Sequence, residues 1–100
     1  MATVFTAYFG YNGPNSSIDF NRNLLADLLA DSGIDGYTVT PAEGFFDGAH
    51  EPSAVVTVIC QDYYAGEVDA RIRQVCHSYK HAAEQYSVWL TRRQEDLLVI

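Results

Sequence analysis

The sequence predicts an α+β domain in which two helices pack on one face of a four-stranded antiparallel sheet. Residues 52–60 form a β-branched, nearly uncharged run that is typical of a central strand. Residues 18–32 and 65–85 place apolar side chains at helical spacing, which predicts two amphipathic helices. A chain of 100 residues holds one hydrophobic core, so we expect a single domain over residues 1–100.

The N-terminal half predicts a strand, a loop and a helix. Residues 3–10 alternate, and we expect Phe5, Ala7 and Phe9 to face the helices. The stretch GYNGPNSS is rich in turn-forming residues and predicts a loop. Ser16 or Ser17 then caps the helix, and Ser16 with Asp19 approximates a capping box.

The second half predicts three strands around the other helix. Residues 37–46 read as a strand that Pro41 restricts to a sheet edge or a bulge. Residues 47–52 are expected to form the hairpin loop into the central strand. After the helix at 65–85, residues 86–91 alternate as a strand, and residues 92–96 suggest a polar turn. The apolar end, Leu97 to Ile100, predicts a short fifth strand or a packing arm within a C-terminal arm of residues 94–100.

The resulting order is βαββαβ. Two halves with right-handed crossovers predict a split βαβ, or ferredoxin-like, fold with the spatial strand order 4-1-3-2. This order places the residue 52–60 strand inside the sheet and the strand with Pro41 at its edge.

Charge and composition exclude several classes of protein. The net charge is −7, and Arg22 is the one Lys or Arg before Arg71, against ten acids. A phosphate-backbone binder needs clustered cations, so we expect no direct nucleic-acid binding. No run has the length of a membrane span and no N-terminal signal pattern is present, so we expect a cytoplasmic protein without a membrane partner. Cys60 and Cys76 form no C-x-x-C pair, which favours reduced core thiols.

The strand at 52–60 carries apolar side chains on both of its faces. Helices cover only one face of a two-layer fold, so the other face needs a second copy of the chain or the C-terminal arm. We favour self-association into a homodimer or higher oligomer. The candidate partner- and ligand-binding residues are the aromatic and histidine side chains of the strands and loops, with two arginines as anion contacts: Tyr8, Tyr11, Phe45, Phe46, His50, Tyr63, Tyr64, Trp89, Arg92 and Arg93.

Two polar groupings have metal-binding or acid–base potential. His77, His81 and Glu84 stand at i, i+4 and i+7 on the second helix, a spacing that could hold Zn²⁺, although a solvated helix face explains it more simply. Asp47, His50 and Glu51 cluster in the expected hairpin loop, where a histidine beside carboxylates could act as a base.

The loop before the first helix is a third grouping. Its Gly10-Tyr11-Asn12-Gly13 amides could hold an anion at the helix N-terminus. No motif in the chain implies a cofactor.

The chain resembles a group of small bacterial and phage domains of unknown function. The resemblance rests on Tyr8-Phe9-Gly10, on residues 36–44 (GYTVTPAEG), and on Glu51 with Ser53. The sequence departs from that pattern in having Phe46 where a tryptophan is usual and His50 where an arginine is usual. The resemblance implies a ferredoxin-like fold and a phage or bacterial origin, with the host cytoplasm as the location of a phage protein. It implies no activity.

Three functions follow from these observations. We favour a non-catalytic oligomeric binding module that engages a host protein or sequesters a small, nucleotide-like ligand, with counter-defence as one role. The first alternative is a small dimeric α/β-barrel enzyme with a pocket between sheet and helices, in which His50 or Tyr8 acts as acid or base. The second is an acidic nucleic-acid mimic, in which Asp27, Asp31 and Asp35 share a continuous face.

Overall fold

The computed structural model describes all 100 residues, and its main elements follow the order βαββαβ. The two crossover helices are α1 (Ile18–Ala30) and α2 (Ala65–Ala82), and a short 3-10 turn, η1 (Asp62–Tyr64), leads into α2. No helix is both long enough and apolar enough to cross a membrane. The four strands are β1 (Ala2–Gly10), β2 (Thr38–Phe46), β3 (Ala49–Gln61) and β4 (Trp89–Glu95).

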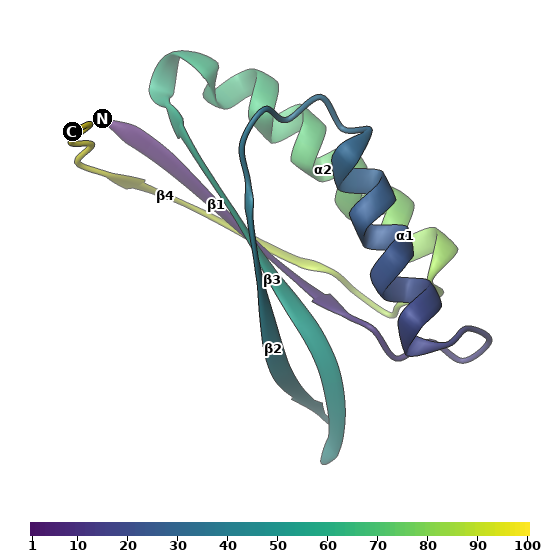
Figure 1. Cartoon of the computed structure of the whole chain (residues 1–100). Helices are drawn as coiled ribbons and strands as arrows, with labels where there is room; N and C mark the ends of the chain where they lie inside the picture. The colour runs from purple at the N-terminus through teal and green to yellow at the C-terminus, as the bar shows by residue number, and fades with distance from the viewer.

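The strands form one antiparallel sheet in the order β2-β3-β1-β4. Read from the opposite edge, this is the order 4-1-3-2 that the crossover rules favour. Pro41 lies on β2, an edge strand, where its missing backbone N–H is tolerated. Both helices lie on the same side of the sheet, which leaves the other side without a layer of its own (Figure 1).

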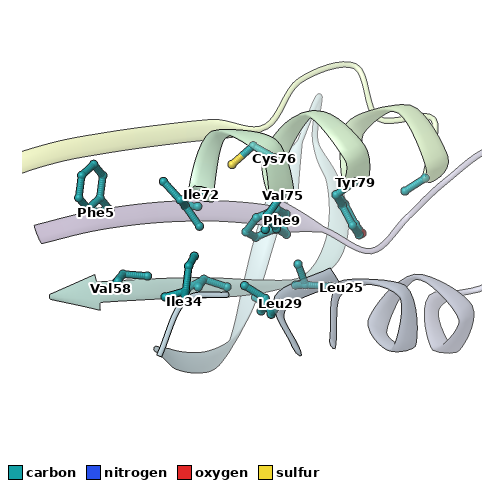
Figure 2. Close-up of a cluster of buried hydrophobic side chains, with 14 of the residues drawn as sticks. Phe5, Phe9, Leu25, Leu29, Ile34, Val58, Ile72, Val75, Cys76 and Tyr79 are labelled. Carbon is teal, nitrogen blue, oxygen red and sulfur yellow. The ribbon is translucent and has the colours of Figure 1, made fainter. Parts of the chain in front are cut away.

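The hydrophobic core fills the space between the helices and one face of the sheet. As predicted, Phe5 and Phe9 point toward the helices, and each is at most 1% exposed. Phe9 meets Tyr79 of α2 edge to face, with 5.1 Å between the ring centroids. The Tyr79 hydroxyl donates to the backbone carbonyl of Gly10, which ties α2 to the end of β1. Figure 2 shows these side chains together with Leu25, Leu29, Ile34, Val58, Ile72, Val75 and Cys76.

The start of α1 differs in one detail from the expected capping box. Ser17 is the N-cap, and its hydroxyl accepts a hydrogen bond from the Phe20 amide at 3.0 Å. The Ser16 hydroxyl instead donates to the side chain of Asn21 at 2.9 Å. Asn21 is the one polar member of the apolar stripe of α1, and it is fully buried.

The expected hairpin loop at 47–52 is wrong, because the turn consists of Asp47 and Gly48 alone. Both residues have positive φ, 51° and 78°, which is the backbone of a tight two-residue hairpin turn and suits an Asp-Gly pair. Pairing therefore resumes at once between Phe46 and Ala49, and β3 runs for 13 residues.

The last strand lies further along the chain than predicted. Instead of residues 86–91 followed by a polar turn, β4 runs from Trp89 to Glu95 and pairs with residues 2–8 of β1. Arginines are accommodated because β4 is an edge strand and their long side chains reach neighbouring groups. Gln94 and Glu95 belong to β4, and the C-terminal arm is therefore limited to residues 96–100, which form no fifth strand.

Both cysteines are free thiols, as expected. Cys76 is buried in the core, and burial raises the pKa of its thiol to about 11. Cys60 is partly exposed, and burial together with the nearby Asp62 carboxylate raises its pKa. Neither thiol has the depressed pKa of a nucleophilic cysteine.

Candidate functional site

The open face is the side of the sheet that points away from the helices. Side chains alternate along each strand, so its rows can be read from the strand register. Tyr8 of β1 lies between Trp89 of β4 and Val55 of β3. Two residues away along β1, the next row is Thr91, Thr6 and Thr57, and beyond it lie Arg93, Val4 and Ile59.

Side chains at the centre of the open face are buried, whereas apolar side chains at its flanks are exposed to solvent. Val4 and Thr6 are 2% and 8% exposed, because neighbouring side chains shield the middle of the sheet. Tyr8, Ile59 and Trp89 are exposed by 47%, 58% and 70%. The C-terminal arm does not cover them, because Leu98, Val99 and Ile100 are themselves almost fully exposed. The alternative in which the arm covers its own sheet is therefore wrong for this structure.

A carboxylate lies at one end of the open face, in what we call the Glu51 hollow: Gly10, Gly44, Glu51 and Ser53. The register pairs Gly44 with Glu51 and Gly10 with Ser53, so two glycines flank β3 at this point. A Cβ on Gly10 would overlap the Glu51 carboxyl group, and one on Gly44 would lie 2.7 Å from the Ser53 hydroxyl oxygen. The missing side chains thus provide the space that Glu51 and Ser53 occupy.

The Glu51 carboxylate has no cationic partner. It takes part in none of the ion pairs of the structure. Burial raises the pKa of its carboxyl group above the usual value. The Ser53 hydroxyl donates to the backbone oxygen of Glu51 at 2.8 Å and leaves the carboxylate free. Tyr8 stands two residues before Gly10 on the same side of β1, so the hollow opens toward an exposed aromatic ring.

The predicted aromatic residues of the hairpin lie at its tip and on both of its faces. Phe45 and Phe46 are 72% and 66% exposed and point to opposite sides because they are adjacent on β2. His50 stacks against Phe45, with 5.3 Å between the ring centroids, and its Nε2 lies 3.9 Å from a Glu43 carboxylate oxygen. His50 and Glu51 alternate along β3 in the same way, so Asp47, His50 and Glu51 do not converge on one point.

Three of the predicted binding residues are held by the protein itself. Tyr11 is 6% exposed, and the Arg22 guanidinium lies over its ring, 5.2 Å from the centroid. Tyr11 is therefore a core residue and cannot contact a partner at the surface. Arg92 lies over the ring of Phe5 and donates to Asp69 at 3.0 Å. Arg93 donates to Glu95 at 2.6 Å. Neither arginine presents an unpaired guanidinium to an anion.

Tyr63 and Tyr64 lie far from the Glu51 hollow, in η1 at the other end of β3. They are 89% and 50% exposed and pack edge to face, with 5.0 Å between their centroids. They do not join Tyr8 and Trp89 in one site.

The metal candidate on α2 does not assemble. His77, His81 and Glu84 line a shallow polar surface, and no group of three His, Cys, Asp or Glu side chains in the structure could hold a metal ion. Glu84 follows the helix with a φ of 52° and accepts a hydrogen bond from Asn15 at 2.6 Å, which explains its position structurally.

The loop between β1 and α1 is pinned rather than open to an anion. The Asn12 side chain donates to the His50 carbonyl at 3.2 Å, and Gln85 donates to the Asn12 carbonyl. A Cβ on Gly13 would lie 2.8 Å from the Ala83 carbonyl oxygen, so the loop packs closely against the end of α2.

Two hollows lie on the solvent side of the helices. One, of about 310 Å³, lies between Leu28 and Asp31 of α1 and Arg71 and Gln74 of α2, and the other borders His77 and His81. The space between helices and sheet is filled by buried side chains, so the pocket expected for an α/β-barrel enzyme is not found there.

Sequence comparison finds no family model that matches the chain and no match among curated proteins. Solved structures are similar at low identity. A phage SAM lyase matches in its apo state, with a TM-score of 0.65 and 14% identity over 91% of this chain and 78% of that chain. Its complex with S-methyl-5′-thioadenosine matches with a TM-score of 0.61 and 15% identity over 93% and 81%.

Two further structures extend the comparison. CPII, a nitrogen regulatory PII-like protein from Thiomonas intermedia bound to ADP, AMP and bicarbonate, matches with a TM-score of 0.57 and 12% identity over 98% and 96% of the two chains. A designed protein with a ferredoxin fold, LFR1 1, matches with a TM-score of 0.54 and 10% identity over 95% and 87%. At these identities the likeness shows the fold, and the chain has the ferredoxin-like fold predicted from its sequence.

The Glu51 hollow was not predicted from the sequence, although Glu51 was predicted to cluster with Asp47 and His50 in the hairpin. The available signal was the pair of glycines within strand positions, Gly10 and Gly44, because an internal strand glycine often marks the close approach of another group.

Proposed function

We propose that this protein is a self-associating α/β binding module that holds a small adenine nucleoside in the Glu51 hollow at the edge of its open face. The observation that carries the proposal is an unpaired, partly buried carboxylate beside exposed aromatic rings on a sheet face that the chain itself leaves uncovered.

Self-association follows from the composition of the open face. Tyr8 and Trp89 are exposed at one flank of the open face and Ile59 at the other, and exposed large apolar side chains grouped on one face mark an interaction site. Sheet faces pack well on one another, and most soluble oligomers consist of identical subunits. Other copies of the chain are therefore the simplest cover for this face.

The chemistry of the hollow favours a nucleoside over a nucleotide. An aromatic ring such as Tyr8 or Trp89 can stack on a purine base, and a carboxylate accepts hydrogen bonds from ribose hydroxyls or an amino group. A phosphate would meet the Glu51 carboxylate, while Arg92 and Arg93 lie opposite Phe5 and Val4, away from the hollow at the end of β1. A cationic group would be stabilised by the same carboxylate. S-adenosylmethionine, the substrate named for the phage lyase, combines an adenine nucleoside with positive charge.

The test is a binding titration with S-methyl-5′-thioadenosine, S-adenosylmethionine, AMP and ADP. Trp89 is the only tryptophan, so its fluorescence reports events near Tyr8 directly. We expect the two nucleosides without phosphate to bind, and Glu51→Gln to weaken binding of S-adenosylmethionine at least about tenfold through loss of the charge. The absence of binding by all four compounds at millimolar concentration would refute the ligand class. A monomeric protein at about 100 μM would refute self-association.

A second candidate function is catalysis on the same ligand. It is favoured by the raised pKa of Glu51, which makes this carboxylate a stronger base than an exposed one. Incubation with S-adenosylmethionine, followed by chromatography for S-methyl-5′-thioadenosine, tests this role. Turnover that Glu51→Gln and Tyr8→Phe both abolish supports an enzyme. Binding without product formation supports the non-catalytic module.

A phage or bacterial origin fits the phage source of one structural relative and remains part of this proposal. Sequestration of a cofactor-like nucleoside in the host cytoplasm would be one way to counteract a host defence. The acidic-mimic alternative also stays a prediction: Asp27, Asp31 and Asp35 are exposed, and binding of a basic partner that weakens steeply with salt would favour it.

A further inference from the structure

The hairpin arm is the tip of the β2–β3 hairpin, residues 41–52. Its tip, residues 45–49, extends beyond the helical layer and is exposed on both faces (Figure 1). Phe45 on one face and Phe46 on the other are 72% and 66% exposed. A two-stranded ribbon with large apolar side chains on both faces is stable only against another layer.

The charged groups of the arm are all acidic. It carries Glu43, Asp47 and Glu51 and no lysine or arginine. Contact between two arms would bring these carboxylates together, and like charges across an interface oppose association. The arm therefore fits a surface that is both apolar and basic.

Such a surface exists at the opposite edge of the sheet. On its open-face side, strand β4 presents Trp89, which is 70% exposed, and, four residues along, Arg93; Arg92 points to the other side and is held by Asp69. The side chains of Arg93 and Glu95 are 57% and 48% exposed, so their ion pair is weak and open to competition from other carboxylates. Strand β4 and the arm lie at opposite edges of the sheet. One copy can therefore pack its arm on a neighbour while its own β4 binds the arm of a third copy or of the same neighbour.

We propose that the tip of the hairpin arm of one copy packs Phe46 and Asp47 against β4 of a second copy, around Trp89 and Arg93. This proposal rests on the self-association proposed above and names its contact. The arm approaches the exposed flank of the open face next to Tyr8, so the second copy closes the aromatic side of the site that begins at the Glu51 hollow.

The experiment compares the mass of the wild-type protein with that of two variants by sedimentation and native mass spectrometry. Phe46→Ser removes the exposed ring from the arm, and Arg93→Glu reverses the charge on β4. We expect each to weaken association at least about tenfold, because exposed aromatic and arginine anchors dominate interfaces. Phe20→Ser removes an exposed phenylalanine of α1, which is 56% exposed and remote from both surfaces, and should leave the mass unchanged.

Mixing the variants separates a direct contact from a general loss of solubility or fold. A Phe46→Ser chain keeps an intact β4, and an Arg93→Glu chain keeps an intact arm. A 1:1 complex between these two chains, each monomeric alone, supports the proposal. A wild-type oligomer that Phe46→Ser leaves intact overturns the arm contact alone. A monomeric wild type overturns the proposed self-association together with this contact.

Discussion

Replacing Asn21 with alanine should cost this small domain a large part of its stability. Asn21 is fully buried in α1, its Nδ2 donates to the Tyr11 carbonyl at 2.6 Å, and its Oδ1 accepts from Ser16 at 2.9 Å. Leaving a buried carbonyl without a donor costs about 1–3 kcal/mol, and the lost second bond and the space left by the amide add about 1 kcal/mol. The expected total is about 2–4 kcal/mol.

Urea unfolding followed by circular dichroism measures this loss. The protein concentration must be held fixed, since association changes apparent stability. Asn23→Ala is the matched control, because Asn23 is exposed on the same helix and should change stability by less than about 0.5 kcal/mol. A loss below about 0.5 kcal/mol for Asn21→Ala would show that water replaces the side chain and that the loop needs no anchor.

Three further predictions concern the Glu51 hollow and the core. The pKa of Glu51 is raised from 4.5 in the fold, so its stabilising contribution is present below that pH and is lost as pH rises through the folded value; Glu51→Gln should therefore raise the melting temperature at pH 7 and not at pH 4. Gly10→Ala should displace the Glu51 carboxylate and weaken nucleoside binding about tenfold, whereas Gly66→Ala, with nothing within 4 Å, should not alter it in a calorimetric titration. The buried Cys76 thiol, with a pKa of about 11, should react with iodoacetamide at pH 8 only on unfolding, as mass spectrometry of the labelled peptides would reveal.

The order and type of the elements could be predicted because the local signals agree with the tertiary fold. Alternation predicts β1, helical spacing predicts the two helices, and Pro41 predicts an edge strand. All three predictions are compatible with one topology. The boundary of β4 was misplaced because Arg92 and Arg93 look like turn residues in isolation. Only the position of Asp69 and the Phe5 ring shows why Arg92 belongs to a strand.

The candidate site was less predictable because it depends on neighbours from three strands. Gly10, Gly44 and Glu51 are distant in sequence, and the register of β3 with both neighbours brings them together. Tyr11 failed as a surface residue for a similar reason. The loop containing it folds under Arg22, a contact that no local pattern announces.

The composition of β3 changes along its length, from the polar hairpin end that carries Glu51 to the apolar end on the open face. Its first residues, through Ser53, are mostly polar or small, and the Glu51 carboxylate lies there without a cation. Its later residues on the open face, Val55 and Ile59, are apolar and lie under no helix. In the proposed contact the hairpin tip packs against a second copy, and burial of the apolar end in the same assembly would add to the hydrophobic gain. A carboxylate with a raised pKa destabilises the free fold at neutral pH, and a ligand that donates to it or carries positive charge offsets that cost. The strand that forms the centre of the sheet therefore links the two proposed activities, because its Glu51 end belongs to the hairpin that makes the contact between copies.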